Sequence, residues 1–249
     1  ASAGTSNFRA GVNAGNSIVS GGNYNTVVGD EAGTAITTGD YNTFMGYQAG
    51  DATTVGIYNV AIGGASLGNN ILGSNSVAVG TSALFSQNYS TATNAYNTAI
   101  GHEAGVAVTT GVQNTLIGGL AGDAITTASN LVAVGNNALG KNTTGALSTA
   151  IGSGALAENT TGAENVAIGY LALTNNTTGT HNVAVGSSDG ASGACLGTNS
   201  TGSQNTALGM QALGSNSTAS NNTAVGYQSL KANTTGASNV AVGTSALDA

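Results

Sequence analysis

A five-residue phrase that ends in glycine recurs along the whole chain and constrains its fold more than any other feature. Each copy consists of asparagine, threonine or valine, a small residue, an aliphatic residue and glycine, with few exceptions. The closing glycines are Gly11, Gly29, Gly46, Gly63, Gly80, Gly101, Gly118, Gly135, Gly152, Gly169, Gly186, Gly209, Gly226 and Gly243. Ten of the thirteen intervals between them are 17 residues long. Such a fixed period indicates a solenoid, in which each coil depends on its neighbours for stability.

The residue types inside the phrase favour a strand over a helix. The second position is threonine or valine in every copy except at Phe8, and the fourth is aliphatic or methionine in every copy except at Ala10. The third position is usually alanine. β-Branched residues concentrated in so short a run are typical of a strand.

Both faces of this strand carry apolar residues. Side chains alternate along a strand, so the third position points away from the side that holds the second and fourth. A strand that is apolar on both faces is buried on both. One face packs inside its own coil, and the other needs a second surface, for which an identical chain is the simplest candidate. The phrase therefore predicts an oligomer.

A second apolar element and a polar turn complete each coil. Three or four residues after the closing glycine comes an Ala-Leu or Ala-Gly pair, as at 83–84 and 49–50, and later an Asn-Thr-Thr-Gly turn, as at 142–145. Asparagine and glycine tolerate the positive φ that tight turns need. We therefore expect an all-β fold, a parallel β-solenoid (β-roll) of about fourteen 17-residue coils, each with two short strands and two turns.

The repeat covers nearly the whole sequence, so we expect one solenoid domain over residues 1–249, as a segment of a longer fibre. Its register breaks twice: four extra residues fall near 85–96 and six near 187–204. Insertions in solenoids emerge as loops on one face and often carry binding, although a tolerated bulge is the alternative.

Composition excludes several classes of function. Charged residues make up 5% of the chain, and the formal net charge is −7. The three cations, Arg9, Lys141 and Lys231, lie too far apart to form a phosphate-binding surface, so we expect no nucleic-acid partner. No apolar run approaches the roughly 20 residues that span a bilayer, so we expect no membrane insertion. Cys195 is the single cysteine, which excludes an intrachain disulfide framework.

The phrase at 222–230 and the turn at 233–236 resemble the repeats of two related groups of proteins. One is the head domain of trimeric autotransporter adhesins, and the other is the repeat region of bacteriophage tail fibres. The resemblance extends from about residue 7 to residue 247. It implies a left-handed β-roll, three identical chains packed side by side, and a rod-like extracellular fibre. The 17-residue period is longer than is typical of adhesin heads, which moves our preference toward the phage type.

The asparagines that open the phrase are candidates for a structural ladder. Stacked amides bond coil to coil and close turns, with sugar binding as the alternative. The ladder residues are Asn25, Asn42, Asn59, Asn97, Asn114, Asn165, Asn182, Asn205, Asn222 and Asn239.

Four tyrosines precede the phrase and are candidates for contact with a glycan receptor. Tyr24, Tyr41 and Tyr58 are 17 residues apart, and Tyr96 takes the same place in a later coil. Aromatic faces bind sugars well, while simple stacking along the solenoid is the alternative.

Pairs of threonines also repeat, as at 37–38, 109–110, 126–127, 143–144, 160–161 and 177–178. A flat, regular array of threonines matches an ice lattice, so an ice-binding solenoid is a third hypothesis. The pairs lie beside glycine in a turn, and adjacent residues alternate in direction, which argues against a flat array.

Catalysis finds no support in the sequence. His102 and His181 lie far apart in register, neither is near Cys195, and the acidic pair Asp30-Glu31 is typical of a solvated turn. No metal-ligand spacing, phosphate loop or nucleophile elbow occurs. We expect no enzyme, no cofactor and no metal site. The leading hypothesis is an extracellular, phage-type tail-fibre segment that acts as shaft or receptor-contacting module; the alternative is a bacterial surface adhesin or extracellular filament.

Overall fold

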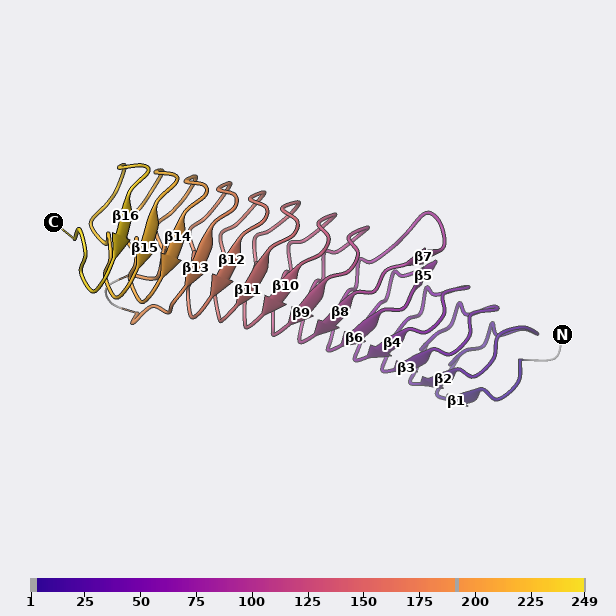
Figure 1. Cartoon of the computed structure of the whole chain (residues 1–249). Helices are drawn as coiled ribbons and strands as arrows, with labels where there is room; N and C mark the ends of the chain where they lie inside the picture. Colours follow the sequence, from indigo (N-terminus) through magenta and orange to yellow (C-terminus); the bar gives the residue numbers. More distant parts are fainter. Residues whose placement is uncertain (1–3, 191–192, 249) are drawn as a thin grey trace. The chain divides into compact units, whose positions relative to one another are not determined.

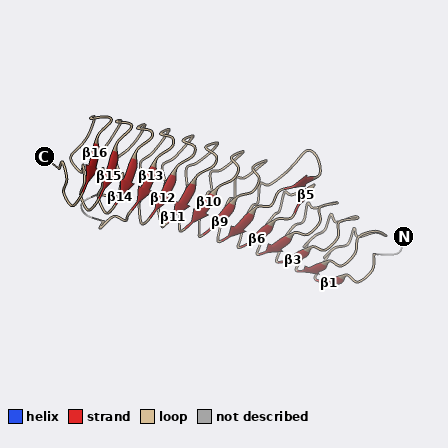
Figure 2. Ribbon diagram, in the orientation of Figure 1, coloured by secondary structure: helices blue, strands red, loops and turns tan. Residues whose placement is uncertain are grey.

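The computed structural model of the chain describes residues 4–190 and 193–248. Its regular elements are sixteen short strands, and these residues contain no helix. The chain divides into two compact units, the first ending at Ser129 and the second starting at Asn130. Within each unit the coils follow one another in sequence order, and the strands lie along one side of the stack (Figures 1 and 2).

The first unit contains seven strands that follow the repeated phrase. They are β1 (Phe8–Ala10), β2 (Thr26–Val28), β3 (Thr43–Met45), β4 (Val60–Ile62), β6 (Val77–Val79), β8 (Thr98–Ile100) and β9 (Thr115–Ile117). Neighbours in this order pair in parallel, and equivalent positions meet, as where Ala61 pairs with Ala78. Two further strands, β5 (Gly73–Ser74) and β7 (Thr93–Asn94), form a separate parallel pair.

The second unit repeats this arrangement. Its strands are β10 (Val132–Val134), β11 (Thr149–Ile151), β12 (Val166–Ile168), β13 (Val183–Val185), β14 (Thr206–Leu208), β15 (Thr223–Val225) and β16 (Val240–Val242). They too pair in parallel and in sequence order. The prediction of an all-β parallel β-solenoid of about fourteen turns is confirmed.

The middle residue of each strand points into the coil. Ala61, Ala99 and Ala167 are fully buried, whereas Ile62, Ile100 and Ile168 on the same strands are exposed. Alanine suits this position because a single coil is thin. Where the middle residue is large, glycine replaces the leucine of the Ala-Leu pair: a Cβ on Gly50 would lie 2.5 Å from the Phe44 ring. The alternation of Ala-Leu and Ala-Gly therefore conserves core volume.

The expectation of two strands in every coil is wrong. The Ala-Leu and Ala-Gly pairs lie in turns, and outside the phrase strand pairing occurs in β5 and β7 alone among the described residues. Ser82 and Leu84 have φ angles of 57° and 50°, so left-handed residues alternate with ordinary ones. An extended strand cannot continue through such residues. The alternation instead directs successive amides to both neighbouring coils: Ser82 N–H donates to Gly64 O, and Leu84 N–H to Ala104 O.

Glycine is required where the phrase ends. Gly101 has a φ of +140°, and a Cβ there would lie 2.4 Å from the carbonyl oxygen of Gly118 in the next coil. No other residue tolerates both the dihedral and the close approach of the two backbones.

Candidate functional site

The asparagines that open the phrase form a buried ladder, here the first amide ladder. In each coil the Oδ1 atom accepts a main-chain N–H from the next coil, as from Asn42 to Asn25 at 2.9 Å. The Nδ2 atom donates across the coil to a turn carbonyl, as from Asn42 to Gly56 at 2.9 Å. All ten predicted residues hydrogen-bond in this column, and nine of them are almost fully buried. Buried amides of this kind hold coils together and leave no group for a sugar.

A second amide ladder runs through the second unit, and the sequence interpretation took its residues for turn residues. Its members donate Nδ2 to the Oδ1 of the preceding coil over 2.8–3.1 Å: Asn142, Asn159, Asn176, Asn199, Asn216 and Asn233. Each also donates to the turn carbonyl three residues ahead. The signal was the exact 17-residue recurrence of Asn in the Asn-Thr-Thr-Gly turn.

The equivalent positions of the first unit are mixed. They hold Ile36, Thr53, Asn70, Gln87 and Val108, all fully buried. Because the column accepts aliphatic, hydroxyl and amide side chains alike, it is a core column whose polarity can vary.

Three of the four predicted glycan-contact tyrosines form a tyrosine column. The ring centroids of Tyr24 and Tyr41 lie 4.9 Å apart and those of Tyr41 and Tyr58 5.0 Å, with interplanar angles of 11° and 9°. Each ring remains about half exposed. Desolvation, then the neighbouring tyrosines and Asp40, raise the pKa of Tyr41. The faces of Tyr41 are therefore covered by its neighbours, and a ligand meets ring edges, hydroxyls and the outer faces of Tyr24 and Tyr58.

Tyr96 does not join this stack. It is exposed, and the position before it in the column is held by Asn75. Among the described residues, Tyr96 makes no ring contact.

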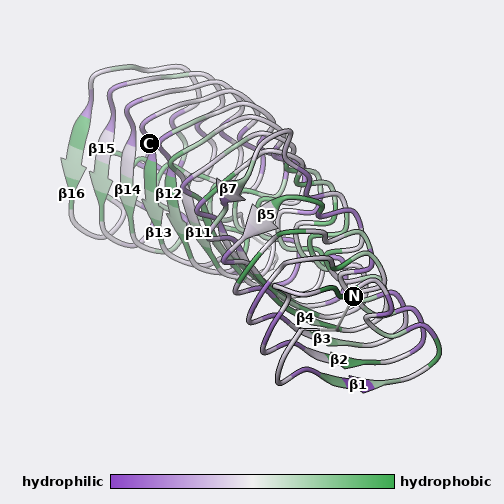
Figure 3. Cartoon of the chain, turned by 90° about the vertical axis from the view of Figure 1, so that its right-hand side faces the viewer, coloured by the Kyte–Doolittle hydropathy of each residue, from purple (hydrophilic) through white to green (hydrophobic). Residues whose placement is uncertain are grey.

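The outward side of the strands is apolar, and we name it the sheet face. It consists of the second and fourth residues of the phrase, whose middle neighbour points inward. Exposed members are Met45, Ile62, Ile100, Ile117, Ile151, Ile168, Leu208, Val240 and Val242. Several strands, among them β12 and β13, carry the green of hydrophobic residues in Figure 3. A contiguous exposed apolar surface marks an interaction site in soluble proteins.

The threonine pairs form a polar edge, the threonine corner. The first threonine donates its hydroxyl to a carbonyl of the next coil, as from Thr160 Oγ1 to Thr177 O at 2.9 Å. The second threonine of the pair, such as Thr161, is exposed. The corner therefore has one inward-bonded and one solvent-facing hydroxyl per coil.

The first register break is an ordered insertion. The loop before β7 projects beyond the neighbouring coils (Figure 1). Tyr89 is buried, and its hydroxyl donates to Gly111 O at 2.9 Å and accepts from Asn97 Nδ2 at 3.3 Å. Burial raises the pKa of Tyr89 to about 12. The buried Gln87 amide donates to Asn70 Oδ1 and Ser76 Oγ.

The second register break spans 187–204, of which residues 191–192 lie outside the described residues. Gln211 Nε2 donates to Asp189 Oδ2 at 3.2 Å, and a depression of about 220 Å³ lies beside Ser188, Leu171 and Thr198. Cys195 is fully buried, and burial raises the pKa of its thiol to about 12. It takes the inward place that alanine has in other coils, and its thiolate is disfavoured.

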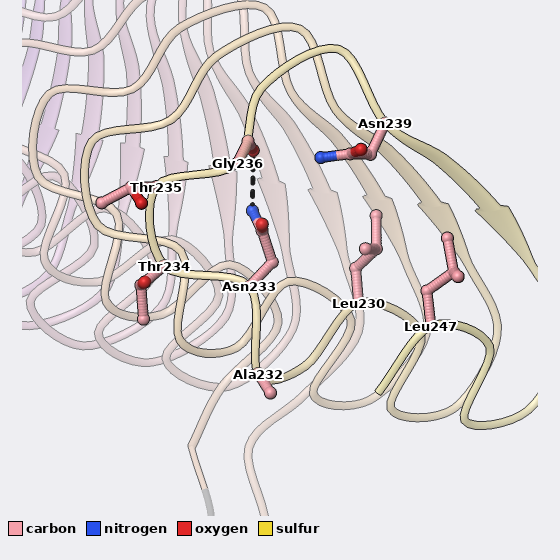
Figure 4. A pocket seen from close by; sticks show the side chains of 8 residues that line it. All are labelled: Leu230, Ala232, Asn233, Thr234, Thr235, Gly236, Asn239 and Leu247. Carbon is pink, nitrogen blue, oxygen red and sulfur yellow. Dashed lines mark hydrogen bonds between the residues drawn. The ribbon is translucent and has the colours of Figure 1, made fainter. Parts of the chain in front are cut away.

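A larger depression, of about 380 Å³, lies at the last coil (Figure 4). Leu230 and Leu247 line it together with Asn233, whose Nδ2 donates to Gly236 O at 2.9 Å. These are the residue types that inner coils cover with a neighbouring coil, so the depression has the composition of a coil interior.

The charged residues form isolated pairs. Lys141 Nζ lies 2.6 Å from Glu158 Oε2, and His181 Nε2 lies 2.9 Å from Glu164 Oε2, each across one coil step and exposed. Burial, with Glu103 nearby, raises the pKa of Asp123. Within residues 4–190 and 193–248, no cluster of three or more His, Cys, Asp or Glu side chains could hold a metal ion. The same residues include no helix able to cross a membrane.

The comparisons with known proteins add no family to this geometry. The chain matches no protein-family model, no curated protein and no solved structure.

Proposed function

We propose that the chain is a structural or adhesive segment of an extracellular fibre, and that identical chains cover its sheet face. The observation that carries this proposal is the exposed row of Val, Ile, Leu and Met on strands whose inward side is already packed. Burying such a surface is favourable at roughly 25 cal/mol per Å² of apolar area.

An identical chain fits this surface better than an unrelated partner. The sheet face repeats once per coil, and a partner must present apolar groups at the same spacing to contact every strand. A second copy has that spacing by construction, and closed symmetry lets the same patch serve on each chain.

Three chains side by side, each wound left-handed, are the arrangement that we propose on the strength of the resemblance to tail fibres and adhesin heads. A phage-type tail-fibre shaft or receptor-contacting module is our first choice. A bacterial surface adhesin or extracellular filament is the alternative. The proposed receptor is a cell-surface glycan or protein, with Tyr24, Tyr41, Tyr58 and Tyr96 as glycan contacts.

Sedimentation equilibrium of the intact chain tests the assembly. We expect a mass three times the 23.8 kDa of one chain at micromolar concentration. A folded species with the mass of one chain at that concentration would overturn the proposal.

Ice binding is a second candidate, favoured by one observation. The second unit exposes a threonine in each of six successive coils: Thr144, Thr161, Thr178, Thr201, Thr218 and Thr235. Thermal hysteresis of the purified protein tests it, and its absence would end that hypothesis.

A further inference from the structure

The tyrosine column is interrupted by a gap one coil wide. Tyr58, Asn75 and Tyr96 occupy the same place in three successive coils, since Val60 pairs with Val77 and Val77 with Thr98. Their φ angles are 57°, 60° and 50°, so their side chains leave the backbone in similar directions. Asn75 thus stands where a further tyrosine would continue the stack, and we call this place the one-coil gap.

The gap has the width of one ring. Strands of a sheet lie about 4.8 Å apart, so Tyr58 and Tyr96 stand about 10 Å from each other. A flat ring midway would lie about 5 Å from each tyrosine, inside the range in which rings stack. The chain itself uses this spacing, with 5.0 Å between Tyr41 and Tyr58. Tyr58 packs one face on Tyr41, which leaves its other face toward the gap.

The floor of the gap is polar and held in place. Asn75 Nδ2 donates to Asn94 Oδ1 at 2.9 Å, and Asn94 belongs to β7, which the first register break adds to the fold. The break is anchored by the buried Tyr89, whose ring packs against Gly73: a Cβ there would lie 3.0 Å from the ring. The amides of Asn75 and Asn94 are thereby fixed between two exposed aromatic rings.

We propose that the one-coil gap binds a single pyranose ring of a glycan, with Tyr58 and Tyr96 against its faces and the amides of Asn75 and Asn94 on its hydroxyl groups. The inference rests on the glycan-contact part of the proposed function and locates it. A sugar is favoured over an aromatic ligand because the floor offers amide groups, which a wholly apolar ring would leave without partners. The register break then has a role, since it supplies Asn94.

Saturation-transfer NMR with methyl glycosides of N-acetylglucosamine, galactose and rhamnose tests the site on the intact chain. Tyr96→Ala removes one wall, and Asn75→Tyr fills the gap with a ring in a conformation that Tyr58 already adopts. Tyr24→Ala is the matched control, because it removes a ring from the far end of the column. Thermal unfolding and sedimentation verify that each variant is folded and assembled.

We expect saturable transfer from at least one glycoside, a tenfold or greater loss of affinity in Tyr96→Ala and Asn75→Tyr, and unchanged affinity in Tyr24→Ala. Absence of saturable binding to the unmodified chain, binding that survives Asn75→Tyr, or equal loss in Tyr24→Ala would overturn the site. Binding of indole in place of the glycosides would also overturn it, in favour of an aromatic ligand. A chain that assembles but binds no glycoside disproves the gap alone, and one that binds as a monomer disproves the assembly alone.

Discussion

The sheet face and the threonine corner belong to the same coils, and both are exposed at intervals of one coil, yet their chemistry is opposite. Ile168 on the sheet face ends in an aliphatic group with no polar partner in reach. Thr160 at the corner donates its hydroxyl to the next coil, and Thr161 beside it faces solvent. Both surfaces obey the same repeat, so the repeat alone does not explain the difference.

The contrast teaches which surface is finished in a single chain. The corner satisfies its polar groups within the stack and leaves hydroxyls for water, whereas the sheet face leaves apolar area exposed on every strand. A surface of the first kind is stable in water, and one of the second kind gains from a partner.

The largest effect is expected from a charge on the sheet face. Ile168→Glu would bury an unpaired carboxylate between chains, which costs several kcal/mol. We expect the dissociation constant of the assembly to rise by a factor of about 100 or more, measured by sedimentation. Thr161→Glu places the same charge on the corner of the same coil and should leave the assembly intact. Equal behaviour of the two variants would remove the distinction between the surfaces.

A smaller effect is expected from the amide beneath the corner. Asn176 donates to Asn159 Oδ1 and Gly179 O and accepts from Asn199 Nδ2. Asn176→Ala leaves buried partners without a bond, so the free energy of unfolding should fall by about 3 kcal/mol. The exposed Thr178→Ala, two residues away, should change it by less than about 0.5 kcal/mol. Denaturant unfolding measures both, and a comparable loss in Thr178→Ala would assign stability to the outer hydroxyls.

The smallest effect separates the two threonines of a pair. Thr160→Val removes the donor to Thr177 O and should lower the free energy of unfolding by about 1 kcal/mol. Thr161→Val, which removes an exposed hydroxyl, should stay within about 0.5 kcal/mol of the parent chain. The reverse order would show that the exposed threonines, and not the inward-bonded ones, join the coils.

The parallel solenoid could be predicted because the phrase fixes the position of every strand. The direction of each side chain could not be derived from polarity, since Val60, Ala61 and Ile62 are all apolar; size decides, and alanine goes inside. The second strand was predicted wrongly because Leu84 adopts a positive φ that composition gives no reason to expect.

The candidate sites divide in the same way. The stacking of Tyr24, Tyr41 and Tyr58 follows from their 17-residue spacing, while the covering of the Tyr41 faces emerged from the ring geometry. The gap at Asn75 depends on its bond to Asn94, which lies across an insertion whose path no periodicity defines.

Thiol labelling tests the central claim, the covering of the sheet face by another chain, most directly. Ile151 is 39% exposed in the single chain, and Thr161 is exposed at the corner, so Ile151→Cys and Thr161→Cys would both react in a monomer. The native Cys195 is fully buried and provides a silent background. The account predicts that, in the native protein, maleimide modifies Ile151→Cys at least tenfold more slowly than Thr161→Cys. Equal, rapid modification of both thiols would contradict it.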